Sequence, residues 1–236
     1  MQTNQPVDVL IVGISGNQPI DERLQALYGD KLDEWVRQGD ISTKRGELRL
    51  LPTLSGDVAR VLFVGLGKVD QLSQDNLRRL LGKAAQHVKA RRLEQVTVDA
   101  TTFPGQPVEL IAETFTLATY EVKHYKTSPS KAYTLHLTVL PSEDEAVRRG
   151  KALGEATNLA RRLVTMPGDL LTAPALADEA RFIAERHGHD LRIIDKEEME
   201  ALGMGALLAV NQGSVIPPKL IVLEYKGSVE APIAVV

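Results

Sequence analysis

The sequence predicts an α/β protein: a mixed sheet with helices packed on both of its faces, followed by the incomplete start of a second α/β domain. Apolar runs of strand length alternate with amphipathic segments of helix length through residue 140. A long segment with a stripe of small residues interrupts this series, and the alternation then resumes up to Val236. Such alternation is typical of largely parallel or mixed sheets that are covered by helices.

The strands of the first part are predicted from short apolar runs bounded by glycine, proline or polar residues. The runs "VDVLIVGI" and "RVLFVGLG" are so apolar that both are predicted to be buried on two faces. The predicted strands are residues 7–14, 47–53, 60–67, 95–100 and 133–140.

Three amphipathic segments between these strands are predicted helices. The first spans residues 21–39 and would break at Gly29. The second begins after an N-cap at Ser73 and runs to Arg92. Its apolar face carries Leu77, Leu80, Leu81, Ala84 and Val88. The third follows Pro107, and its apolar face carries Ile111, Phe115, Ala118, Val122 and Tyr125.

A helix over residues 142–168 is predicted to join two domains, 1–141 and 169–236. Ser142 and Glu145 have the spacing of a capping box, which predicts the helix start. Pro167 predicts that the helix ends just before it. The helix carries a stripe of small or apolar residues, namely Ala146, Gly150, Leu153, Thr157, Ala160 and Val164.

The last part of the chain predicts a second alternating series with too few elements to cover both faces of a sheet. Its predicted elements are a helix over 173–187, a strand over 190–195, a short helix over 196–203, a run over 205–214, a strand over 219–225 and a strand over 232–236. Because the last strands would present an open edge or an uncovered apolar face, we expect residues from about 170 onward to pair with a second copy, swap or be poorly ordered.

Composition limits the class of protein. The chain has 236 residues, 43% of them hydrophobic and 25% charged, which is ordinary for a globular protein. The absence of cysteine excludes disulfides, thiolate metal sites and a cysteine nucleophile. The N-terminus has no basic signal-peptide segment, so a cytoplasmic location is expected. A net charge of −3 argues against a generally nucleic-acid-binding surface.

Two short motifs are candidate ligand sites with simpler structural explanations. The turn "GLGK" at residues 65–68 could cradle a phosphate, but it completes neither known glycine motif, so we expect a tight turn. His187 and His189 could bind a metal, but a third ligand is missing, so we expect a glycine-terminated helix end. His87, His124 and His136 are isolated, and His136 is predicted in a strand.

Basic residues cluster twice. The helix after Ser73 carries Arg78, Arg79, Lys83, Lys89, Arg91 and Arg92. These could contact phosphates, but without interleaved aromatics we expect a solvated helix face. The basic segment "KHYKTSPSKAY" at residues 123–133 contains Pro129 between serines and is expected to be a surface connection.

No catalytic, metal or substrate-binding residue is assigned, and no cofactor is expected in this chain. The carboxylates Asp178, Glu179, Glu197, Glu198 and Glu200 are predicted on solvated helices. Asp169 and Asp195 are predicted at element ends, where capping explains them. The serines stand in no nucleophile-elbow motif.

The second half nevertheless resembles the leucyl aminopeptidases of the two-metal, cytosolic type. The segments "NLARRLVTMPGDLLTAPALADEA" and "EEMEALGMGALLAVNQGSVIPPKLIVLEYKG" carry the resemblance. Its most specific elements are Met199, Leu202–Gly205, Val210, Gly213–Ser214, Pro217–Pro218 and Tyr225. In the first half, "VLFVGLGK" and "YEVKHYKT" are similar to pieces of the family's N-terminal domain. The chain departs from the family at Thr165 and Asp169, where asparagines are usual.

The resemblance implies a macro-like N-terminal domain and a catalytic domain that binds two divalent metals, zinc, manganese or magnesium. Such metallopeptidases are hydrolases that remove N-terminal residues, often leucine, from peptides, and they assemble as hexamers. The family's first metal ligands follow a strand like "PIAVV", so none can be assigned here, and we expect this chain alone to be an inactive N-terminal portion. The alternatives are a DNA-binding, nucleotide-binding or oligomerisation module formed by the N-terminal domain; no membrane partner is expected.

Overall fold

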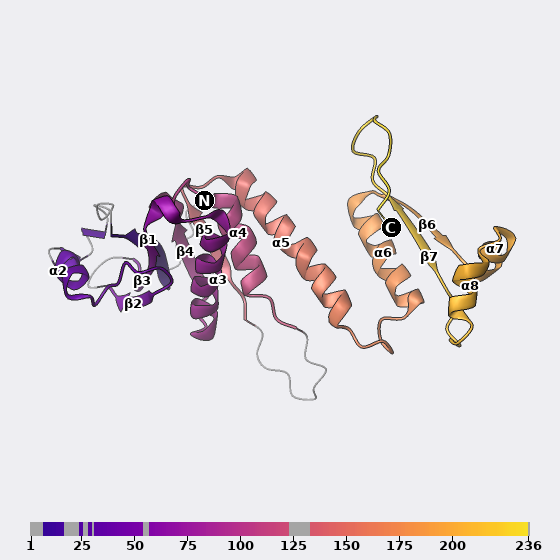
Figure 1. The fold of residues 1–236 in the computed structure, drawn as a ribbon, viewed down its shortest axis with the longest axis horizontal. Coiled ribbons are helices and arrows are strands. Elements are labelled where there is room, and N and C mark those ends of the chain that lie inside the picture. Colours follow the sequence, from indigo (N-terminus) through magenta and orange to yellow (C-terminus); the bar gives the residue numbers. More distant parts are fainter. Residues whose placement is uncertain are drawn as a thin grey trace. The chain divides into compact units, whose positions relative to one another are not determined.

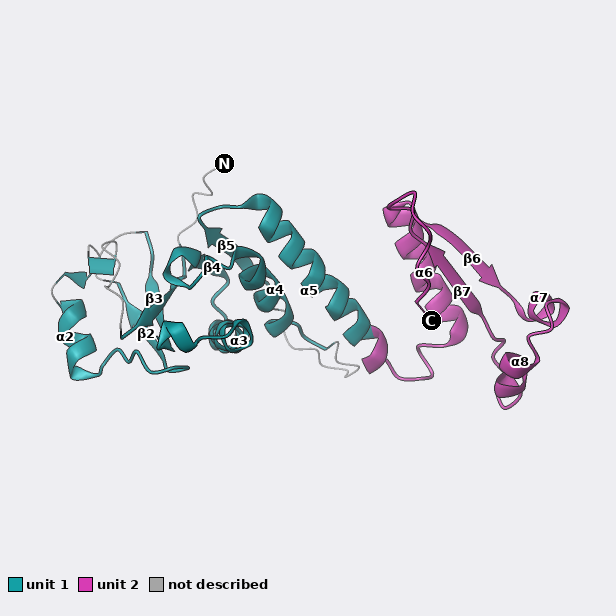
Figure 2. Ribbon diagram, turned by 45° about the horizontal axis from the view of Figure 1, so that its top comes forward, with its two compact units in different colours: residues 1–162 teal, residues 163–236 magenta. Residues whose placement is uncertain are grey.

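A computed structural model describes residues 7–16, 24–25, 28–29, 31–53, 57–122 and 133–235. The chain divides into two compact units, unit 1 over residues 1–162 and unit 2 over residues 163–236, which are teal and magenta in Figure 2. Most of the predicted basic segment at 123–133 and a part of the first predicted helix, residues 21–23, 26–27 and 30, lie outside the described residues.

Unit 1 is built on a five-stranded sheet with the strand order β2-β3-β1-β4-β5 (Figure 1). The strands are β1 Val9–Ser15, β2 Leu48–Pro52, β3 Arg60–Gly67, β4 Gln95–Asp99 and β5 His136–Leu140. Strand β2 pairs antiparallel with β3, and the other pairs are parallel. The predicted mixed α/β sheet and its strands are confirmed.

Helices cover both faces of this sheet. They are α2 Lys31–Gln38, α3 Gln74–Ala90 and α4 Val108–Ala118. Alternate strand residues such as Val96 and Val98 form one core with α3 and α4. Val12 and Phe63 form a second core with Leu32 of α2. Because successive strand residues point to opposite faces, a nearly continuous apolar strand can contribute to both cores.

Helix α3 follows its sequence prediction. Ser73 is the N-cap, and its side chain accepts a hydrogen bond of 3.3 Å from the backbone N–H of Asn76. All five apolar residues predicted on one face are buried. The cap satisfies one of the free N–H groups of the first turn, and the apolar stripe fixes which side of the helix faces the sheet.

Helix α4 is shorter than predicted. It ends at Ala118, so Val122 lies beyond the helix and is 44% exposed, while Tyr125 lies outside the described residues. Lys89 of α3 explains this end, because its ammonium donates to the carbonyl oxygens of Thr119 at 3.0 Å and Tyr120 at 3.1 Å. A cation on the final carbonyls stabilises a helix C-terminus.

Helix α5 (Asp144–Thr165) ends before Pro167 as predicted, but it does not begin with the predicted capping box. The hydroxyl of Ser142, which precedes the helix, instead donates to the carboxylate of Asp144, the first residue of α5, at 2.7 Å. Serine side chains readily bond to nearby groups in this way, which competes with the capping geometry.

The small residues of the α5 stripe bring this helix against α4. A Cβ atom added to Gly150 would lie 2.2 Å from the carbonyl oxygen of Glu109, and one added to Gly154 would lie 2.7 Å from the Cβ of Thr116. The amide of Asn158 donates to the carbonyl of Thr116 at 3.0 Å. The larger members of the stripe take no part in this contact, because Leu153 and Val164 are exposed.

Unit 2 contains a two-stranded antiparallel sheet and three helices. All of them lie close to their predicted positions except α8, which forms within the run 205–214, for which no element type was predicted. The elements are α6 Ala173–His187, β6 Asp190–Ile194, α7 Lys196–Ala201, α8 Gly205–Asn211 and β7 Leu220–Glu224. The Thr172 hydroxyl caps α6 by accepting from the N–H of Ala175 at 3.3 Å. The strand predicted over 232–236 is absent from the described residues 232–235, where Ile233 is 92% exposed and has no strand partner.

Strand β7 is apolar on both faces but poorly covered. Its residues Leu220, Ile221, Val222 and Leu223 form a continuous apolar run, and none of them is buried. The buried hydrophobic residues among the described part of unit 2 are Ala177, Ala184, Ile194 and Met199. A continuous apolar run is typical of a strand inside a sheet that is covered on both sides. The uncovered apolar face expected from the sequence is therefore confirmed.

Candidate functional site

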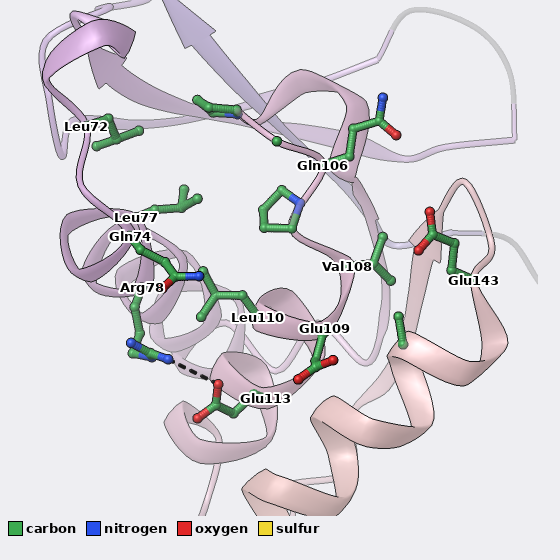
Figure 3. Close-up of a pocket in the computed structure, with 14 residues that line it drawn as sticks. Leu72, Gln74, Leu77, Arg78, Gln106, Val108, Glu109, Leu110, Glu113 and Glu143 are labelled. Carbon is green, nitrogen blue, oxygen red and sulfur yellow. Dashed lines mark hydrogen bonds and ion pairs between the residues drawn. The ribbon is translucent and has the colours of Figure 1, made fainter.

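A groove of about 620 Å³ lies between the N-terminal end of α3, the loop before α4 and the start of α5 (Figure 3). Its apolar lining includes Leu72, Leu77, Val108 and Leu110. Its charged lining consists of Arg78, Glu109, Glu113 and Glu143. The groove exists because α3 and α4 pack side by side on one face of the sheet while α5 begins beside them.

Most of the charged side chains around this groove form ion pairs with other side chains. Arg78 donates to the carboxylate of Glu113 at 3.2 Å and lies 3.8 Å from that of Asp75. The Glu109 carboxylate pairs with Arg149 at 3.4 Å. These pairs hold helices together. Among the described residues, the lining includes no serine, threonine, histidine or lysine, so its candidate reactive groups are the carboxylates, two of which are already in ion pairs. The described residues of this groove form no set of nucleophile, base and orienting group.

The glycine segment at residues 65–68 is not the tight turn that was expected, because Gly65–Gly67 form the end of β3 and pair with Ile14 and Ser15 of β1. The N–H groups of Gly65 and Gly67 donate to the carbonyl oxygens of Glu47 at 2.9 Å and Thr43 at 2.8 Å. A Cβ at Gly65 would lie 2.1 Å from the carbonyl oxygen of Lys44, and Gly67 has a φ of +74°. Because both amides are already bonded to the chain, they are not available to cradle a phosphate.

His187, the last residue of α6, and His189 just beyond it form the expected helix end. Gly188 between them adopts a left-handed conformation with a φ of 69° and terminates the helix. The rings of His187 and His189 stack at 5.8 Å, and His189 meets Tyr225 edge-on at 5.3 Å. In the part of the chain that the structure describes, no group of three or more His, Asp or Glu side chains could hold a metal ion. The described residues therefore do not fit the divalent metals that the resemblance implies.

The basic residues of α3 are mostly held within unit 1. Arg79 pairs with Asp75 at 3.5 Å, and the Lys89 ammonium pairs with Glu121 at 3.3 Å in addition to its contacts at the end of α4. The guanidinium of Arg91 donates to the carbonyl oxygen of His87 at 3.4 Å. Burial lowers the pKa of His87, and the neighbouring Arg91 lowers it further.

The carboxylates considered in the sequence of unit 2 form surface ion pairs. Asp178 pairs with Arg181, Glu198 with Arg192, Asp195 with Lys219 and Glu200 with Lys196. Exposed pairs of this kind contribute little to stability and indicate no catalytic role. The structure brings none of them into a shared site with His187 or His189.

Sequence patterns did not reveal the buried polar groups of β4. Asp99 and Thr97 are 4% and 9% exposed, and both line a second cavity of about 290 Å³ on the sheet face opposite α3 and α4. The available signal was the polar alternation within "QVTVDA", which places Thr97 and Asp99 on one face of a strand whose other face is apolar.

Solved structures with the same fold define the class of protein. The bottromycin maturation enzyme BotP aligns with a TM-score of 0.77 and 26% identity over 93% of this chain and 46% of BotP. The structure of BotP in complex with Mn gives the same TM-score. A mutant of tomato leucine aminopeptidase aligns with a TM-score of 0.74 and 23% identity over 92% of this chain and 47% of that protein. The fold is that of leucine aminopeptidase-like enzymes.

The family follows from the sequence comparisons. The chain belongs to the cytosol aminopeptidase family: the family's N-terminal domain matches residues 11–129, and its catalytic domain matches residues 158–236. A probable cytosol aminopeptidase of Exiguobacterium sibiricum is 74% identical over 232 residues, which is 98% of this chain and 49% of that protein. A probable cytosol aminopeptidase of Bacillus subtilis is 34% identical over 251 residues, a match that also covers 98% of this chain and 49% of that protein. The chain spans about half the length of the curated relatives it matches.

Proposed function

We propose that this chain supplies the N-terminal part of a metal-dependent leucyl aminopeptidase, and that the 236-residue chain alone does not hydrolyse peptides. The family membership supports the first statement. The second is supported by β7: among the described residues it pairs with β6 alone, and none of its apolar residues is buried as a strand inside a covered sheet would be.

The proposed parent reaction is the hydrolysis of N-terminal residues, leucine among them, from peptides. Two divalent ions, zinc, manganese or magnesium, would supply the Lewis acid and the activated water in the complete enzyme. The described residues offer no ligand set for these ions, so no catalytic step is assigned to any side chain of this chain.

A chimera tests the parent activity. The chain would be fused to the remaining C-terminal part of the Exiguobacterium sibiricum relative, at the position where the match with that protein ends. We expect a folded chimera that hydrolyses leucine anilide when manganese is added. A monodisperse, folded chimera with no hydrolysis under any of the three metals would contradict the proposal.

We further propose a cytoplasmic location and self-association. The location is supported by the absence of cysteine and by the names of the relatives. Among the described residues, no helix is both long and apolar enough to cross a membrane. Self-association is supported by the exposed apolar surface of β7, and light scattering at several concentrations tests it: a concentration-independent monomer mass would contradict it.

A further inference from the structure

The inference concerns the groove of Figure 3 and an adjoining cavity of about 590 Å³ in unit 1. The two share Pro104, Gly105, Gln106 and Glu143, so they meet at the loop before α4 and form one elongated depression, which we call the α4 trough. Each of the two cavities alone has the volume of a small-molecule site. The trough therefore has room for an extended segment of several residues.

The groove half of the trough has an apolar floor. Leu77, Val108 and Leu110 form its base and are buried. Apolar residues that are only half-buried surround this base, namely Leu72, Pro104, Pro107 and Ala146. Covering their exposed surface with aliphatic side chains would remove it from water, which is favourable.

Glu143 carries the one uncompensated charge among the described residues of the trough. The Glu109 carboxylate is paired with Arg149 at 3.4 Å. That of Glu113 is paired with Arg78 at 3.2 Å. The exposed Glu143 carboxylate forms no ion pair or hydrogen bond with any residue that the structure describes. Because it lies where the two cavities meet, it favours a cationic group on the molecule that occupies them.

Two side-chain amides of the trough can bond a peptide backbone. Gln74 and Gln106 line the groove, and neither amide is bonded within the described part of the chain. Figure 3 shows Gln106 on the same side of the groove as Glu143, and Gln74 on the other side. A glutamine amide both donates and accepts hydrogen bonds, as does each peptide unit of an extended segment. A simple polyamine would leave the amide oxygens and the apolar floor largely unused.

We propose that the α4 trough is a docking site for a short extended peptide segment that carries a basic side chain next to aliphatic side chains. The basic side chain contacts Glu143, and the aliphatic side chains cover the floor beside Leu72 and Pro107. Peptide groups of the segment bond the amides of Gln74 and Gln106. Docking requires neither a metal nor a hydrolytic step, so the site is independent of the proposed aminopeptidase function.

Three blocked peptides test the proposal by methyl NMR of the full chain. Each is acetylated and amidated, so none offers the free N-terminus that an aminopeptidase needs, and a failure of the proposed hydrolysis leaves this test intact. A peptide of leucine and lysine should shift the methyl resonances of Leu72, Val108 and Leu110 in a saturable manner. A peptide with glutamate in place of lysine should not bind, and one with serine in place of leucine should bind about tenfold more weakly. The methyl resonances of Leu32, in the other core, should not move.

The same titrations distinguish other occupants of the trough. Absence of saturable shifts with the leucine–lysine peptide would overturn the proposal. Equal binding of the glutamate peptide would overturn the assignment of the basic side chain. Equal binding of cadaverine would show that the trough takes a small cation, and so would overturn the assignment of a peptide. Shifts of the same resonances with rising protein concentration alone would overturn it in favour of a second copy of the chain.

One variant and one matched control locate the basic side chain. Glu143→Gln keeps the size of the side chain and removes its charge, so it should weaken binding of the leucine–lysine peptide about threefold to fivefold at low salt, the value of one exposed ion pair. Salt at roughly 1 M should remove this difference. Glu155 is another exposed glutamate without a partner among the described residues, farther along α5, and Glu155→Gln should leave the affinity unchanged. Unchanged affinity of the folded Glu143→Gln chain, or equal losses in both variants, would overturn the contact with Glu143.

Discussion

Several side chains in unit 1 stabilise the fold by hydrogen bonds to the backbone of residues far away in the sequence. The Asp8 carboxylate accepts hydrogen bonds from the N–H groups of Glu94 and Gln95, both at 2.9 Å, and so joins the starts of β1 and β4. Burial raises the pKa of Tyr133 to about 12, with smaller contributions from Glu94 and Asp8, and its hydroxyl donates to the carbonyl of Leu93 at 2.6 Å. These contacts connect the strand starts on one side of the sheet.

His87 should make the stability of unit 1 dependent on pH. Its pKa is lowered from 6.5 by burial and by Arg91, and its Nε2 atom is buried without a hydrogen-bond partner among the residues that the structure describes. The unfolded chain therefore binds a proton more readily than the folded chain, so stability falls as pH drops below about 6.5. Urea unfolding between pH 5 and pH 8 should show this loss.

The variant His87→Gln is the control for that experiment, because it removes the titrating group and keeps a polar side chain. We expect a smaller decrease of unfolding free energy between pH 7 and pH 5 in this variant. If the wild type and the variant lose the same stability over that interval, His87 is not responsible for the dependence.

Secondary-structure elements were predicted well where the apolar period was regular and less well at their ends. The period and the N-cap of α3 were sufficient to predict that helix. The end of α4 was missed because Lys89, which lies on another helix, holds its last carbonyls. The contact of α5 with α4 depends on the close approach of two backbones at Gly150 and Gly154, and the stripe alone could not separate such contacts from exposed positions.

Replacing Gly150 by alanine should separate α5 from α4. Alanine is normally the better helix former by about 1 kcal/mol. Here, however, its Cβ would meet the Glu109 carbonyl at 2.2 Å, and overpacking of this kind costs about 1–3 kcal/mol. We expect net destabilisation of unit 1 in urea unfolding. Gly82→Ala in α3 is the matched control within unit 1, since the nearest atom to its added Cβ lies 3.8 Å away, and it should cause no loss of stability.

At the scale of the whole molecule, the two units differ in how completely they bury their apolar residues. Both hydrophobic core clusters found among the described residues belong to unit 1. The class of fold was predictable from alternation alone, and the resemblance of residues 155–236 to leucyl aminopeptidases is confirmed by the family match. The prediction of a strand over 232–236 was wrong for the described residues 232–235. A strand needs a second strand to pair with, and an apolar sequence does not by itself provide one.

Amide hydrogen exchange should be slower in unit 1 than in unit 2. The amides of β1 and β3, at the centre of the five-stranded sheet, should be the slowest to exchange. Those of β7, which pairs only with β6 and is half exposed, should exchange at least about tenfold faster. Comparable protection of β7 and β1 in a monomeric sample would show that unit 2 is stable without further covering layers.

The most direct test of the account is an assay of leucine anilide hydrolysis by the chain itself, with its mass of 25.8 kDa verified and with manganese, zinc or magnesium added. We predict no turnover above buffer with metal, because among the described residues no group of three or more His, Asp or Glu side chains could hold a metal ion. Metal-dependent turnover that remains with the protein through repeated purification would contradict it.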